Sequence, residues 1–140
     1  MTQRLFLFDL DGTLVDSAPD LAGAMNEMLA ARGLPERPLE ELREPSGHGG
    51  PALLKAAFGM ERTDPRFEAM RQEFLERYAA RATRSSTLYP NVVQMLDRLI
   101  AAGVKLGVVT NKPQGLAEIV CDHLGLTPRM TVVVGLGPAG

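Results

Sequence analysis

The sequence lacks several features that mark specialised classes of protein. Its 140 residues include no tryptophan and one cysteine, Cys121, so a disulfide framework or a cysteine-based metal site within one chain is excluded. Its 15 basic and 17 acidic side chains give a net charge of −2, without the excess of positive charge that binds nucleic acid. No apolar run approaches the roughly 20 residues of a membrane helix. We therefore expect a cytoplasmic protein with no nucleic-acid or membrane partner and an unspecified oligomeric state.

Three short apolar runs predict strands buried on both faces of a parallel sheet. They cover residues 4–8, 104–110 and 130–134. Apolar side chains at helical spacing occupy residues 91–102 and 114–124, before and after the second run. Strands that alternate with helices are typical of an α/β fold with a parallel sheet.

A long segment without strand signals separates the first strand from the helix at residue 91. Helical stripes begin near residues 17, 51 and 67 in this segment, and roughly 65 residues are far more than an ordinary connection needs. We interpret the segment as a helical cap. The predicted division is residues 1–17 for the first core strand and catalytic loop, 18–85 for the cap, and 86–140 for the rest of the core.

The loop after the first strand carries the strongest chemical signal. Asp9 and Asp11 are two residues apart, directly after the apolar run, and Gly12 and Thr13 follow them. Ligands of open α/β sheets bind at the carboxyl ends of the strands. Paired carboxylates suit Mg²⁺, and an aspartate is able to attack phosphorus while a second aspartate transfers protons. The glycine allows the backbone to approach a phosphate.

These motifs resemble those of the haloacid dehalogenase-like hydrolases. Residues 9–15 match the signature Asp-x-Asp-Gly-Thr-Leu-Val, and residues 16–21, 88–92 and 108–112 resemble the phosphoglycolate phosphatase branch. The likeness covers about residues 3–134. It implies an α/β fold in which a Rossmann-like parallel-sheet core, incomplete at its C-terminus, carries an inserted all-α cap.

The resemblance also implies a role for each matching residue. Asp9 is expected to be the nucleophile and a Mg²⁺ ligand, and Asp11 the general acid and base, with its backbone carbonyl on the metal. The implied phosphate-binding residues are Gly12, Thr110 and Asn111. The implied cofactor is Mg²⁺, and the implied partner is a small phosphorylated metabolite, in particular 2-phosphoglycolate.

Three further residues have expected places but weaker support. His48 and Gly49 are predicted to lie in a substrate-facing loop of the cap, although a solvent-exposed glycine-rich loop explains them equally well. Lys112 is expected at the rim of the site, because the catalytic lysine of this family comes later in the chain. A set of arginines in the cap is interpreted as a solvated helix face balanced by nearby glutamates: Arg66, Arg71, Arg77, Arg81 and Arg84.

Two elements of the family pattern are missing from the sequence. No lysine follows Lys112 and no acidic residue follows Asp122, so neither the later lysine nor the later acidic cluster is present. We expect weak or absent turnover and an exposed apolar edge at residues 130–134 that promotes aggregation. The alternatives that stay open are a non-catalytic fragment that binds phosphate or a partner, and a phosphomutase. A receiver-type phosphoacceptor domain ranks last, because it has no insert of this size.

Overall fold

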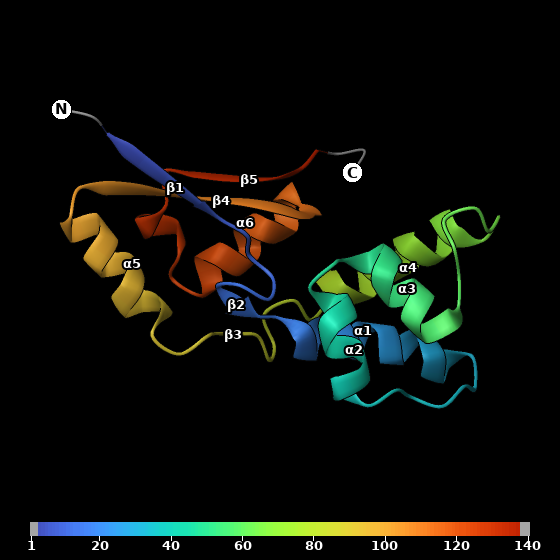
Figure 1. Ribbon diagram of the computed structural model, residues 1–140. Coiled ribbons are helices and arrows are strands. Elements are labelled where there is room, and N and C mark those ends of the chain that lie inside the picture. The colour runs from blue at the N-terminus through green and yellow to red at the C-terminus, as the bar shows by residue number, and fades with distance from the viewer. Residues whose placement is uncertain (1–2, 138–140) are drawn as a thin grey trace. The chain divides into compact units, whose positions relative to one another are not determined.

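The computed structural model describes residues 3–137, which divide into two compact units (Figure 1). One unit contains the chain up to Asp16 and from Thr87 onward, and the other contains Ser17–Ser86. Each crossing between the units therefore falls one residue away from the predicted boundary. Among the described residues, none of the helices combines the length and apolar character that a membrane span requires.

The first unit is built on a parallel sheet. Its strands β1 (Arg4–Phe8), β4 (Val104–Pro113) and β5 (Val132–Leu136) lie in the order β1-β4-β5. Helix α5 (Val92–Ala101) connects into β4, and helix α6 (Gln114–His123) with the short 3₁₀ helix η1 (Thr127–Arg129) leads to β5. This arrangement confirms the predicted α/β class with a parallel sheet.

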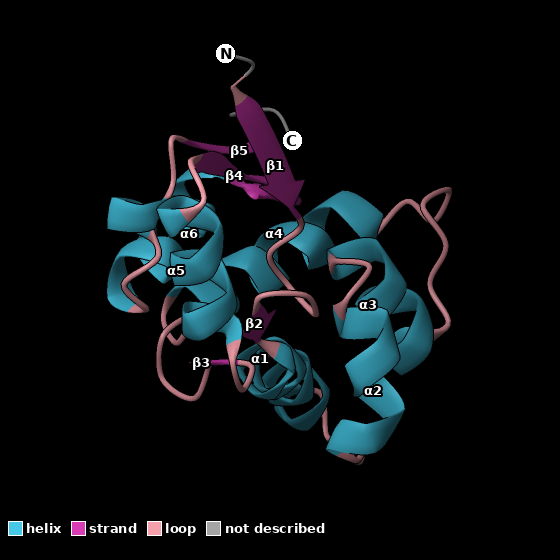
Figure 2. Cartoon of the chain, turned by 60° about the vertical axis from the view of Figure 1, so that its left-hand side comes forward, coloured by secondary structure: helices cyan, strands magenta, loops and turns pink. Residues whose placement is uncertain are grey.

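Helices α5 and α6 pack on one face of this sheet, as the views in Figures 1 and 2 agree. Leu106 and Val108 of β4 point to that face and are buried. Their burial follows from the alternation of a strand, which places every second side chain on the same face. Leu96 of α5 and Val120 of α6 are likewise fully buried, so the core of this unit lies between the sheet and the two helices.

The opposite face of the sheet, which we call the open face, carries apolar side chains that are 37% to 55% exposed: Leu5, Leu7, Val109, Val132 and Val134. The prediction that these three strands are buried on both faces is therefore wrong for the described residues. The apolar residues of β1 reflect a strand suited to a two-sided core, but within the described residues of this unit both packed helices lie on the other face.

We predict that the open face drives self-association. An apolar surface of this kind, on a sheet with an exposed edge strand, favours contact between copies. Val134→Lys places a charge on the face beside Val109 and is expected to lower the apparent mass at high protein concentration, as measured by light scattering. Thr131→Lys, an exposed position just before β5, is the matched control. Equal association of the two variants would argue against the open face as the contact.

A short antiparallel ribbon belongs to the same unit, at the points where the chain leaves and re-enters it. Strand β2 (Val15–Asp16) pairs with strand β3 (Thr87–Leu88). The backbone N–H of Tyr89 also donates a hydrogen bond to the carbonyl of Leu14, with N and O 3.1 Å apart. The two chain crossings are thus held side by side by backbone hydrogen bonds.

The second unit consists of helices α1 (Ala18–Ala31), α2 (Leu39–Ser46), α3 (Gly50–Phe58) and α4 (Phe67–Ala79). Their buried side chains include Met25, Leu54 and Phe74, as the helical stripes predict. Helix α2 was not predicted. Apart from Pro45, only Leu39 and Leu42 of this helix are apolar. The segment therefore shows little of the apolar periodicity by which a helix is predicted from sequence.

A buried carboxylate joins the start of α1 to the segment after α4. Asp20 is fully buried and accepts hydrogen bonds from the backbone N–H of Ser85 and the hydroxyl of Ser86, both at 2.8 Å. Its other oxygen lies 3.3 Å from Nε of Arg81, which also pairs with Glu27 at 3.0 Å. The interpretation of Arg81 as part of a solvated face is therefore wrong, because its side chain is only 15% exposed.

Candidate active site

The loop that follows β1 is a compact turn. The carbonyl of Leu10 accepts backbone hydrogen bonds from Thr13, Leu14 and Val15, and the N–H of Gly12 donates to the carbonyl of Val15 at 2.9 Å. Gly12 has φ +80°, a conformation that residues with a side chain rarely adopt. The sequence Asp-x-Asp-Gly thus forms a tight turn that carries two carboxylates, two residues apart, in one loop.

The two carboxylates lie in different surroundings. Asp9 is exposed, and its Oδ1 accepts a hydrogen bond of 2.7 Å from the backbone N–H of Leu10. Asp11 is 9% exposed, and its Oδ1 lies 3.4 Å from Nζ of Lys112. Asp9 is therefore the carboxylate that a substrate or a metal ion reaches from solvent, whereas Asp11 is held by a buried cation.

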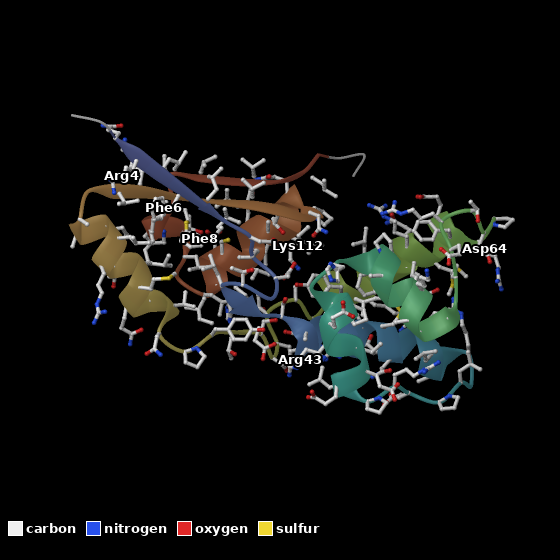
Figure 3. All side chains as sticks on the ribbon, in the orientation of Figure 1. Arg4, Phe6, Phe8, Arg43, Asp64 and Lys112 are labelled. Atoms are coloured by element: carbon white, nitrogen blue, oxygen red, sulfur yellow. The ribbon has the colours of Figure 1, made fainter. Side chains whose placement is uncertain are left out.

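Lys112 does not lie at a rim as expected. Its side chain is 3% exposed at the end of β4 (Figure 3). The strand runs three residues past its predicted end at Thr110, and the buried face continues from Val108 through Thr110 to Lys112. Extending the alternation of the strand to Pro113 was the signal that could have placed Lys112 inside.

The phosphate-binding candidates on β4 alternate between the two faces of the strand. Thr110 is buried, and its Oγ1 accepts a hydrogen bond of 3.2 Å from the backbone N–H of Lys112. Asn111 is exposed. Because β1 and β4 are parallel neighbours with Phe8 opposite Val108, the loop after β1 and residues 110–112 lie at the same edge of the sheet. This edge gathers carboxylates, a hydroxyl, an amide and an ammonium group.

The pairing of β4 with β5 is irregular at this edge, between Val109 and Pro113. The side chain of Gln114 fills the irregularity, donating a 2.9 Å hydrogen bond to the carbonyl of Val133 and accepting one from the N–H of Gly135. A Cβ on Gly135 would lie 2.5 Å from the carbonyl oxygen of Lys112. Only glycine allows this close approach, which packs the backbone of β5 against Lys112.

At this edge of the sheet, the carboxylates suited to Mg²⁺ are few. Among the described residues, no group of three or more His, Cys, Asp or Glu side chains is arranged to hold a metal ion. Mg²⁺ is commonly held by one or two carboxylates together with water and substrate phosphate. The exposed carboxylate of Asp9 and the backbone carbonyl of Asp11 fit such a minimal set.

His48 and Gly49 lie in the helical unit, between α2 and α3. The imidazole Nε2 of His48 lies 3.3 Å from a carboxylate oxygen of Glu44, and the side chain is 67% exposed. Gly49 has φ +95° and directly precedes α3. The loop is thus an exposed turn between two helices of the cap, and its role toward substrate stays a prediction.

The single cysteine is buried behind this edge of the sheet, on α6. Burial, together with the nearby carboxylates of Asp122 and Asp11, raises the pKa of Cys121 to about 11, while the ammonium group of Lys112 opposes the rise. The thiolate is the reactive form, so we expect negligible alkylation of the native chain by iodoacetamide at pH 8 and rapid alkylation after unfolding.

This shift also predicts a dependence of stability on pH. The folded thiol keeps its proton above the unfolded value of 9.0, so its contribution to stability is complete below pH 9 and is lost as the pH rises toward 11. Cys121→Ser, measured by urea unfolding between pH 8 and 11, should show a shallower decline. A decline identical to that of the unsubstituted chain would contradict the assignment.

The sequence as a whole was compared with known families and proteins. A family model described as haloacid dehalogenase-like hydrolase matches residues 6–138. A phosphoglycolate phosphatase of Xanthomonas campestris is 45% identical over 132 residues, which cover 94% of this chain and 59% of that protein. An N-acetylmuramic acid 6-phosphate phosphatase of Pseudomonas aeruginosa is 40% identical over 96% of this chain and 59% of its own length.

The fold also resembles those of solved structures. The crystal structure of a predicted phosphoglycolate phosphatase from Haemophilus somnus superimposes with a TM-score of 0.80 at 33% identity, covering 95% of this chain and 62% of that one. A haloacid dehalogenase-like hydrolase from Bacteroides fragilis gives a TM-score of 0.83 at 19% identity, which supports the fold alone. The chain spans about three fifths of the length of these proteins.

Proposed function

Because the chain belongs to the haloacid dehalogenase-like hydrolases, we propose that it is a Mg²⁺-dependent phosphatase acting on a small phosphomonoester. The observation that carries the proposal is the pair of unlike carboxylates at one end of the sheet. Asp9 is exposed and Asp11 is buried beside Lys112, and Thr110 and Asn111 follow on the neighbouring strand. Carboxylates in different surroundings are suited to different chemical tasks.

In the proposed reaction, an oxygen of Asp9 attacks the phosphorus atom, and the bond between phosphorus and the ester oxygen breaks. Asp11 donates a proton to the departing alkoxide. Asp11 then accepts a proton from a water molecule that attacks the phosphorylated Asp9, which releases inorganic phosphate and regenerates both carboxyl groups. The amide groups of the turn at Gly12, with Thr110 and Asn111, would donate hydrogen bonds to the phosphoryl oxygens.

Asp9 and the backbone carbonyl of Asp11 would hold the metal ion. Mg²⁺, when bound there, offsets the negative charge that the carboxylate and the phosphate bring together. Because the described residues offer no third acidic ligand at this place, we propose that Mg²⁺ binds weakly and that turnover is slow. Protein ligands for one side of the ion are replaced by water in such a site.

Two substrates are proposed from the names of the relatives. The Xanthomonas relative is a phosphoglycolate phosphatase and the Pseudomonas relative is an N-acetylmuramic acid 6-phosphate phosphatase. We favour 2-phosphoglycolate, since the identity to the first relative is higher. The residues of the cap that would select the substrate, including His48 and Gly49, are proposed to face it.

The test is release of inorganic phosphate from each ester by the purified chain, with Mg²⁺ and with EDTA. The proposal expects slow release that depends on Mg²⁺ and is faster for 2-phosphoglycolate. The absence of release from either ester, together with measurable binding of inorganic phosphate, would instead support a non-catalytic phosphate-binding protein.

A further inference from the structure

Lys112 is a buried cation on the inner face of β4, and the mechanism above does not use it. Its side chain is 3% exposed, and Nζ lies 3.4 Å from Oδ1 of Asp11. The residues that precede it on the same face are Val108 and Thr110. A lysine in this position keeps its charge only with a nearby anion, since burial of an isolated ammonium group is strongly unfavourable.

The pair is not explained by stability alone. A buried ion pair gains little over well-packed apolar residues, because the cost of removing both charges from water offsets their attraction. An apolar side chain would extend the buried row of β4 equally well. The partner of Lys112 is instead the carboxylate to which the proposed function assigns proton transfer.

Lys112 is tied to the site at its backbone as well as at its ammonium group. Its N–H donates to Oγ1 of Thr110 at 3.2 Å, and its carbonyl lies against Gly135, where a Cβ would approach to 2.5 Å. The lysine is thus fixed at its backbone by β4 and β5. Because the side chain beyond this backbone is itself only 3% exposed, packing limits where the ammonium group is able to move.

We propose that Lys112 is a positioning residue, which holds the Asp11 carboxylate at the end of β4 and offsets the negative charge that a phosphate adds beside Asp9 and Asp11. The inference rests on the proposed function. Without Lys112, two carboxylates and a phosphate dianion would share one end of the sheet with no buried cation among the described side chains there. The lysine acts on the phosphate through Asp11, without being its direct ligand.

The test compares Lys112→Met with Lys105→Met, its matched control. Lys105 lies on the same strand but is exposed, opposite Leu5 on the open face. The probe is inorganic phosphate with Mg²⁺, titrated calorimetrically, and the second readout is kcat and KM for 2-phosphoglycolate. We expect Lys112→Met to weaken phosphate binding about tenfold and to lower kcat more than it raises KM, whereas Lys105→Met changes neither by more than about twofold.

Variants of Lys112 and Asp11 separate positioning from other roles. Lys112→Arg keeps the positive charge and should retain most of the phosphate affinity. Lys112→Gln removes the charge and should lose phosphate affinity as Lys112→Met does. If Lys112→Met does not fold, the Arg and Gln variants are compared instead. In an Asp11→Asn background, removal of the lysine should weaken phosphate binding by a clearly smaller factor than it does in the unsubstituted chain. Equal behaviour of Lys112→Met and Lys105→Met would overturn the inference, as would an undiminished effect of Lys112→Met in the Asp11→Asn background.

Failure of this inference is distinguishable from failure of the proposed function. If Asp9→Asn leaves phosphate release intact, the proposed function is wrong. If Asp9→Asn abolishes release and Lys112→Met still matches Lys105→Met, the function stands and the role of Lys112 is wrong.

Discussion

Asp9→Asn is expected to abolish the Mg²⁺-dependent release of phosphate, with a loss of roughly a thousandfold or more in kcat. The amide is nearly the size of the carboxylate but is a poor nucleophile and a poor ligand for a hard cation. Asp9 is exposed, and its Oδ1 accepts a hydrogen bond from the N–H of Leu10, which the amide oxygen of an asparagine is also able to accept. The melting temperature should therefore stay within a few degrees of that of the unsubstituted chain.

The matched control for Asp9→Asn is Asp97→Asn. Asp97 is an exposed carboxylate of the same unit, and it pairs with Arg129 at 2.8 Å. The guanidinium of Arg129 lowers the pKa of Asp97, and the substitution removes this ion pair. Phosphate release by Asp97→Asn should nevertheless be unchanged. Activity that survives in Asp9→Asn would remove Asp9 from the nucleophilic role.

Asp20→Ala is expected to destabilise the helical unit by about 3 kcal/mol. The carboxylate of Asp20 is fully buried and satisfies Ser85, Ser86 and Arg81 together. Its removal leaves a largely buried guanidinium with Glu27 as its remaining partner in this cluster, and it leaves the hydroxyl of Ser86 without its acceptor. Unfolding in urea, followed by the helical signal in circular dichroism, measures the loss.

Asp64→Ala is the control for this prediction. Asp64 pairs with Arg66 at 2.9 Å, where the arginine is 75% exposed, and exposed pairs contribute little to stability. The contrast between the two variants separates burial from the mere presence of an ion pair. Equal unfolding midpoints for Asp20→Ala and Asp64→Ala would contradict the structural role assigned to Asp20.

The elements of the fold with strong periodicity could be predicted from the sequence. The strand at residues 4–8 and the helices that begin near residues 91 and 114 lie where apolar spacing places them. Helix α2 was missed because half of its residues are charged and few are apolar, and β5 begins two residues later than predicted, at Val132. Burial could not be predicted from composition, because exposure of Leu5 and Leu7 depends on what packs against the sheet.

The candidate site was predictable in its residues but not in its electrostatics. The motif after β1 and the residues after Val109 identified the edge of the sheet. The ion pair between Asp11 and Lys112 joins positions about a hundred residues apart in the sequence, so only the register of β1 with β4 reveals it. Arg81 and Asp20 form a second pair between distant positions, and local charge patterning had assigned its arginine to solvent.

In the proposed reaction, Asp9 forms a covalent bond to phosphorus. The most direct test mixes the chain with Mg²⁺ and 2-phosphoglycolate, N-acetylmuramic acid 6-phosphate or p-nitrophenyl phosphate, quenches it rapidly in acid, and maps the modified peptide by mass spectrometry. We expect one phosphoryl group on Asp9 with at least one of these esters, and none in Asp9→Asn. An unmodified chain with all three esters, or a phosphoryl group on another residue, would contradict it.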